Sequence, residues 1–231
     1  MKRYSILLFL FLATFAYADS SSWVQIDQGD GLTIYKKEVP GSPILAFKGE
    51  GVIHAPISRV AGVLFDNTRA PEWVDSLAES RILKQISPTS HIEYNHVTTP
   101  FIIKDRDFVN LVQIHLDPKT ETLTLHYSPG PSGFMPQTKY VRGELTQSVF
   151  VLQSIDHGRK CHFVGEIHAD PKGAIPKWIV NLFQRNWPRN TFNGLKAQLA
   201  KKDLKEPPCY IDLYKEMMDF NASNGAASSS N

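Results

Sequence analysis

One stretch near the end of the chain decides the fold, DPKGAIPKWIVNLFQRNWPRNTFNGLKAQLAK at residues 170–201. Its apolar side chains recur at the spacing of one helical face: Ile175, Trp178, Ile179, Leu182, Phe183, Phe192, Leu195 and Leu199. The pattern predicts a long amphipathic helix over residues 174–201. Pro176 suits the first turn of this helix, whereas Pro188 lies inside it and predicts a kink near Asn186.

Most of the chain before this helix alternates with the two-residue period of β-strands. Leu123, Leu125 and Tyr127, for example, alternate with polar neighbours. The predicted strands are residues 32–38, 44–54, 80–86, 91–98, 106–116, 121–128, 140–154 and 159–170. Short links rich in Pro, Gly and Asp join most of them, so we expect an antiparallel sheet.

Two shorter helical patterns, residues 57–65 and 68–77, lie between the second and third predicted strands, and the second carries Trp73. They are too small to cover one face of an antiparallel sheet of about eight strands. We therefore expect an α+β fold in which a curved sheet wraps around the long C-terminal helix. Such an arrangement leaves an apolar cavity, which is a ligand site by default.

The first 18 residues have the three regions of a secretory signal. Lys2 and Arg3 precede an apolar run at residues 6–15, and Ala16-Tyr17-Ala18 follows it. The run is shorter than the roughly 20 residues that cross a bilayer. We expect cleavage before Asp19, export to the periplasm or the extracellular space, one domain over residues 19–204, and a largely disordered extension over 205–231.

The chain carries 25 basic and 23 acidic residues, with a net charge of +2 and no block of like charges. This balance does not suit a nucleic-acid surface, so we expect no nucleic-acid partner. We expect a monomer that contacts membrane surfaces transiently.

The two cysteines, Cys161 and Cys209, form no CxxC motif. The strand that begins at Cys161 and the helix that returns from its far end bring both cysteines to the same end of the domain. A disulfide between them and a pair of separate thiols both remain open.

No residue pattern predicts a cofactor, a catalytic nucleophile or a metal site. His162, Glu166 and His168 share one face of a predicted strand, but the two histidines are about 20 Å apart there and cannot hold one ion.

Five short motifs occur in an order that resembles a known family. They are Gly49-Glu50-Gly51-Val52-Ile53, Glu72-Trp73-Val74, Lys104-Asp105-Arg106-Asp107-Phe108-Val109, Val141-Arg142-Gly143-Glu144 and residues 170–178. Together they resemble START domains, the steroidogenic-acute-regulatory-protein-related lipid-transfer modules, in an exported, single-domain form of bacterial type. The resemblance implies a helix-grip fold that encloses one lipid or other hydrophobic molecule, without covalent chemistry.

Steroid-carrying members of that family place an acidic residue and an arginine inside the tunnel. The resemblance puts the acidic position at Glu93, but the arginine position falls on Val112. A buried carboxylate without a partner is costly, so we expect Glu93 to find another cation, with Arg142 as our hypothesis, or to bind water or a ligand donor.

The candidate ligand-binding residues share a place on the inner faces of the predicted sheet and helix: Glu93, Arg106, Arg142, Trp178, Leu182, Phe183 and Phe192. For Arg106, a structural anchor at the strand end is an alternative. If the helix floors the site, Leu182→Trp should abolish ligand loading.

We expect a lipid binder and carrier rather than an enzyme. One alternative is a cyclase- or aromatase-like enzyme that uses the same cavity, for which Glu93, Arg142 and His96 are the acid–base candidates. Another is a protein-interaction module whose cavity is filled by bulky side chains.

Overall fold

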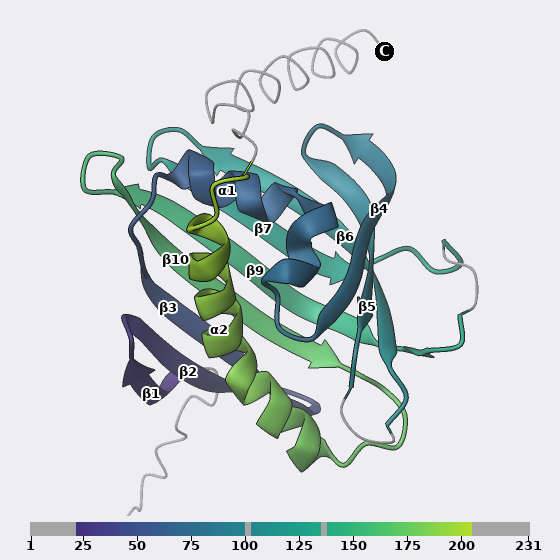
Figure 1. Ribbon diagram of the computed structural model, residues 1–231. Helices are drawn as coiled ribbons and strands as arrows, with labels where there is room; N and C mark the ends of the chain where they lie inside the picture. Colours follow the sequence, from purple (N-terminus) through teal and green to yellow (C-terminus); the bar gives the residue numbers. More distant parts are fainter. Residues whose placement is uncertain (1–21, 100–102, 135–137, 205–231) are drawn as a thin grey trace, which may run out of the picture.

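The computed structural model describes residues 22–99, 103–134 and 138–204. Its sheet contains ten strands within these ranges (Figure 1): β1 (Val24–Gly29), β2 (Leu32–Val39), β3 (Ser42–Ile53), β4 (Leu77–Ser87), β5 (Ser90–Val97), β6 (Arg106–Asp117), β7 (Thr122–Pro129), β8 (Val141–Arg142), β9 (Glu144–Ile155) and β10 (Lys160–Asp170). The predicted signal segment, residues 1–18, and the extension 205–231 lie outside the described residues.

Nine strands follow the order β1-β2-β3-β10-β9-β7-β6-β5-β4, and all neighbours in this order are antiparallel. The predicted antiparallel sheet is therefore confirmed, with β1 as an addition. The predicted strand 140–154 divides at Gly143, because the short β8 pairs in parallel with β6 before β9 joins β7 and β10. Gly143 permits this crossing, since a Cβ there would lie 2.4 Å from the Phe108 ring.

Three helical elements lie on the concave side of the sheet, α1 (Ile57–Phe65), the 3₁₀ helix η1 (Asn67–Glu72) and α2 (Lys177–Leu199) (Figure 1). The predicted helix 68–77 is shorter than expected, because Pro71 lies within η1 and Trp73 already follows it. The helix α2 is continuous across Pro188, so the predicted kink does not interrupt it.

Glycines in β3 let α2 approach the sheet closely. Gly49 and Gly51 are two residues apart and so lie on the same face. A Cβ on Gly49 would lie 2.9 Å from Cβ of Pro188, and one on Gly51 would lie 3.0 Å from the ring of Phe192. Pro188 and Phe192 are four residues apart and share a helix face. The missing side chains of β3 therefore form the seat of α2.

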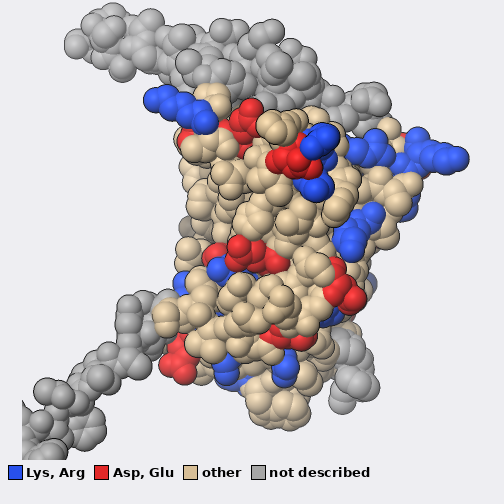
Figure 2. Space-filling model, turned by 90° about the vertical axis from the view of Figure 1, so that its left-hand side faces the viewer, with Lys and Arg blue, Asp and Glu red and all other residues tan. Residues whose placement is uncertain are grey.

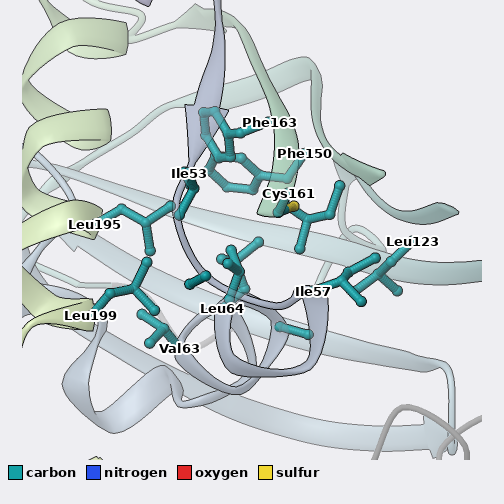
Figure 3. Close-up of a cluster of buried hydrophobic side chains, with 14 of the residues drawn as sticks. Ile53, Ile57, Val63, Leu64, Leu123, Phe150, Cys161, Phe163, Leu195 and Leu199 are labelled. Carbon is teal, nitrogen blue, oxygen red and sulfur yellow. The ribbon is translucent and has the colours of Figure 1, made fainter. Parts of the chain in front are cut away.

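The core lies between α1, the C-terminal half of α2 and the strands beneath them (Figure 3). Phe163 of β10 lies between Phe150 and Phe192, with ring centroids 5.8 and 5.6 Å away. Cys161 is fully buried in this cluster, and burial raises the pKa of its thiol to about 12. Cys209 lies outside the described residues, so its pairing with Cys161 stays a prediction.

Charges of both signs are interspersed on the face shown in Figure 2, and uncharged residues cover most of that face. Within the described ranges, no helix combines the length and the apolar character needed to cross a membrane.

Candidate ligand-binding cavity

A cavity of about 260 Å³ lies between the sheet, the η1 region and the N-terminal half of α2. Its wall is mostly apolar, with contributions from nearly every neighbouring element: Leu64, Trp73, Val74, Val97, Ile103, Phe108, Leu145, Phe150, Ile167, Ile175, Val180, Phe183 and Trp187. The volume is close to the lower end of the range of about 300–1,000 Å³ that is typical of small-molecule sites.

Polar side chains gather at one part of this wall, which we call the polar end: Asn67, Glu93, Asn95, Asn110, Tyr127 and Ser148. Strand pairing explains why they meet. Asn110 of β6 is the direct partner of Glu93 in β5, and Ser148 of β9 is the partner of Tyr127 in β7. Directly paired residues share a face of the sheet, so these side chains point to the same side.

Glu93 is buried, with 4% of its surface exposed, and its carboxylate accepts two hydrogen bonds. The Nδ2 atoms of Asn67 and Asn95 each lie 2.5 Å from one of its oxygens. His91 Nε2 is 3.5 Å away without making a hydrogen bond. Within the described part of the chain, no lysine or arginine forms an ion pair with this carboxylate, so two amides take the place of the expected cation.

Arg142 is not the partner of Glu93, and that hypothesis was wrong. Its guanidinium binds Asp107 in a bidentate manner, with Nε 2.7 Å from Oδ1 and Nη2 3.1 Å from Oδ2. Asp107 follows Arg106 on β6 and so points to the opposite face of the sheet. Burial alone would raise the pKa of Asp107, but bonds from Arg142 and Thr138 outweigh it and lower the pKa.

Arg106 lines the cavity and is also a structural anchor. Its guanidinium donates to the backbone carbonyls of Lys104, Pro171 and Lys172, and only 3% of the residue is exposed. Burial lowers the pKa of this group from its ordinary value. Three of its five N–H donors are therefore used to hold the segment that leads into α2.

The predicted helix stripe has the wrong face in its N-terminal half. Trp178 and Leu182 are 69% and 49% exposed and do not line the cavity. Phe183 lines it while remaining 42% exposed, and Phe192 is buried in the core next to the cavity. The residues of α2 that are buried share the other stripe: Val180, Gln184, Pro188, Thr191, Phe192, Leu195, Gln198 and Leu199.

The physical reason is the docking of Pro188 and Phe192 on the glycines of β3. This contact sets the rotation of the whole helix, because an α-helix is rigid about its axis. Gln184 then faces inward, where it bonds both the N–H and the carbonyl of Ala169.

The acid–base set of the enzyme alternative is not assembled. His96 is adjacent to Asn95 in β5 and points to the opposite face, where its Nε2 lies 2.9 Å from Asp105 and its ring stacks on Tyr140. Arg142 is on that face as well, whereas Glu93 lines the cavity.

Sequence reasoning missed Asn67, Asn95, Asn110 and Ser148 as cavity residues. One signal was present, since Asn110 is a polar residue within the otherwise apolar stretch at residues 108–112. Its meaning depends on the register between β5 and β6, which periodicity does not supply.

Residues 12–203 match the START domain family. The chain belongs to this family. Among solved structures, the STAR-related lipid transfer protein of Xanthomonas axonopodis is 25% identical and superposes with a TM-score of 0.68, covering 78% of this chain and 99% of that one. Human StAR-related lipid transfer protein 5 is 18% identical with a TM-score of 0.72, covering 78% of this chain and 88% of that one. The helix-grip fold of START domains is thereby confirmed.

Two proteins of similar sequence extend the comparison. An uncharacterized protein of Pseudomonas aeruginosa is 23% identical to this START domain protein over 184 residues, which are 79% of this chain and 89% of the other. The mitochondrial steroidogenic acute regulatory protein of Danio rerio is 27% identical over 188 residues, 79% of this chain and 65% of the other.

Proposed function

We propose that the protein binds a lipid or another hydrophobic small molecule in the cavity and transfers it between membranes, with α2 as the closing element. The observation that carries this proposal is an apolar-walled cavity of about 260 Å³ inside a START fold. The open volume also argues against an interaction module whose cavity is filled. The dispersal of Glu93, Arg142 and His96 argues against the enzyme alternative.

Burial of the ligand's apolar part supplies the affinity. Each methylene removed from water contributes about 0.8 kcal/mol. Few polar contacts are then needed to hold a single acyl chain or a molecule of similar size. Such binding is reversible, as transfer between two membranes requires.

A pair of identical substitutions tests the site. Leu145 lines the cavity, whereas Leu182 is an exposed residue of α2. Leu145→Trp fills the cavity and should abolish ligand loading, while Leu182→Trp should load normally. The second expectation reverses the one drawn from the helix pattern, because Leu182 does not face the cavity.

Native mass spectrometry of protein purified from its natural host measures the loading. A stoichiometric, chemically unchanged lipid in the wild type and in Leu182→Trp, but not in Leu145→Trp, supports the proposal. An empty wild-type protein that also fails to take up added lipids would refute it. Equal loading of both variants would place the ligand elsewhere.

We also propose that the exposed apolar residues of α2 contact an anionic membrane surface. Trp178 and Leu182 are exposed, and Lys177 and Arg185 flank them on the same helix. Apolar side chains with cationic neighbours suit the interface of anionic lipids. Phe183 belongs to this helix segment and also lines the cavity, so membrane contact and ligand entry would share one end of α2.

Vesicle sedimentation tests this contact. Trp178→Ser should reduce binding to phosphatidylglycerol-containing vesicles, and added salt should weaken wild-type binding because it screens the cations. Wild-type binding that is equal on purely phosphatidylcholine vesicles and unaffected by salt would contradict the charge complementarity.

Export remains a proposal that rests on the residues of the N-terminal segment. We infer cleavage before Asp19 and action in the periplasm or outside the cell. The intact mass of the protein from its natural host, together with cell fractionation, tests this. A full-length cytoplasmic protein would refute it.

A further inference from the structure

The polar end of the cavity contains several buried polar atoms that have no hydrogen-bond partner within the described residues. They are both polar atoms of the Asn110 side chain, Oδ1 of Asn95, Oγ of Ser148 and Nε1 of Trp73. All four residues line the cavity. Asn110 is 1% exposed, Trp73 5% and Ser148 7%. Polar groups this deeply buried are normally hydrogen-bonded, so the wall itself points to an occupant that bonds them.

These atoms offer both kinds of hydrogen bond. Asn110 Nδ2 and Trp73 Nε1 are donors, the carbonyl oxygens of Asn110 and Asn95 are acceptors, and the Ser148 hydroxyl can be either. A group that both donates and accepts satisfies this set better than one that only accepts.

The charge at the polar end disfavours an anion. Glu93 is the direct partner of Asn110 across the strands and has no lysine or arginine partner in the described chain. Arg106, the cation in the cavity wall, is four residues from Asn110 on β6, about 13 Å along the strand. Three of its N–H groups are already bonded to backbone carbonyls.

A cationic head has little left to bind as well. Both oxygens of Glu93 already accept amide hydrogen bonds, one from Asn67 and one from Asn95. An ammonium group would have to displace these amides and leave their N–H groups buried without partners, which is costly.

We propose that the polar end binds an uncharged head group that both donates and accepts hydrogen bonds, an alcohol or an amide, and selects against carboxylate, phosphate and ammonium heads. This inference rests on the proposed ligand-binding function and adds the chemical class of the ligand. Asn110 is the central contact, because both of its unpaired atoms are available to one head group.

Four probes with the same chain test the inference: dodecanol, dodecanamide, laurate and dodecylammonium. Their affinities are measured at pH 8 by displacement of a fluorescent lipid from the full chain. Dodecanol and dodecanamide should bind about tenfold or more tightly than laurate and dodecylammonium, since one unmet buried hydrogen bond corresponds to at least about that factor.

Two variants separate hydrogen bonding from charge. Asn110→Leu should weaken dodecanol and dodecanamide by about tenfold and leave laurate almost unchanged. Glu93→Gln has the same shape without the charge and should narrow the difference between laurate and dodecanol. Asn186→Leu, an exposed position on α2, is the matched control and should behave as the wild type. Ser148→Ala, a smaller change, replaces Asn110→Leu if circular dichroism shows that the latter is unfolded.

The outcomes distinguish this inference from the function on which it rests. Tight binding of the two neutral probes, lost in Asn110→Leu, supports both. Equal binding of all four probes, or tightest binding of laurate or dodecylammonium, would overturn the head-group inference and leave the carrier function standing. Binding of none of the probes, with no displacement of the lipid, would overturn both.

Discussion

At the scale of single residues, Asp107 is the most completely buried charge in the described sheet. Its side chain is fully inaccessible, and it is held by a bidentate contact with Arg142 and by a 2.6 Å bond from Thr138. A buried carboxylate depends on such partners because its desolvation is costly. The pair lies on the face of β6 opposite the cavity, so it stabilises the strand that presents Asn110 without touching a ligand.

Arg142→Ala should therefore lower the free energy of unfolding by about 1–2 kcal/mol, measured by urea denaturation. The lower part of the usual range applies because the Arg142 side chain is 42% exposed. Arg159→Ala removes an exposed partner of Asp156 and should have almost no effect. Equal stability of the two variants would mean that Thr138 alone compensates for the charge. Ligand affinity should be unchanged in both.

At the scale of elements, the packing of α2 on β3 determines what the helix shows to the cavity. Gly49 and Gly51 leave room for Pro188 and Phe192, and Gly194 allows the helix backbone to pass the carbonyl of Trp73, 2.1 Å from where a Cβ would be. These contacts hold the C-terminal half of α2, while the N-terminal half carries both cavity residues and exposed apolar residues.

Gly49→Ala tests this packing, because its Cβ would lie 2.9 Å from Pro188 and 3.3 Å from Leu32. We expect a loss of about 1–2 kcal/mol in urea denaturation, since a rigid proline ring cannot move aside easily. Gly29→Ala is the control, with its nearest atom, in Arg189, 3.8 Å away. If both variants are equally stable, α2 is not held as closely as described.

At the scale of the whole molecule, carboxylates link α2 to both ends of the fold. Glu72, at the end of η1, accepts bonds from Arg69, Lys201 and Gln198. These bonds, with that from Arg69 the strongest influence, hold the pKa of Glu72 far below its ordinary range. Near β1, a bond from Arg189 is the main cause that lowers the pKa of Asp27. Protonation of these groups would release α2 from its neighbours.

Stability should therefore fall in acid. A carboxylate whose folded pKa is depressed contributes stability above its unfolded pKa, about 4, and this contribution is lost as the pH falls toward the folded pKa. Melting temperatures measured between pH 7 and pH 2 should decrease below about pH 4.5. Glu72→Gln should be less stable at pH 7 and should show a weaker decrease in acid. An unchanged acid profile in this variant would exclude Glu72 as a principal contributor.

The chemistry of single residues made part of the fold predictable. Strand alternation, as at Leu123 and Leu125, gave the sheet, and Pro and Gly in the links gave its antiparallel order. The candidate site was predictable only where parity was sufficient: Glu93 and Arg106 line the cavity as expected. Arg142 was misplaced because β8, two residues long, pairs in parallel with β6, and no local pattern indicates such a pairing.

The sequence by itself determined which segments are strands, which are helices and that a long helix covers the sheet, because these depend on periodicities within a segment. Only the tertiary structure decided that Asn110 faces Glu93 and that Trp178 and Leu182 face outward. Those facts depend on the register between strands and on the rotation of α2 on Gly49 and Gly51, which are set by contacts between residues far apart in the chain.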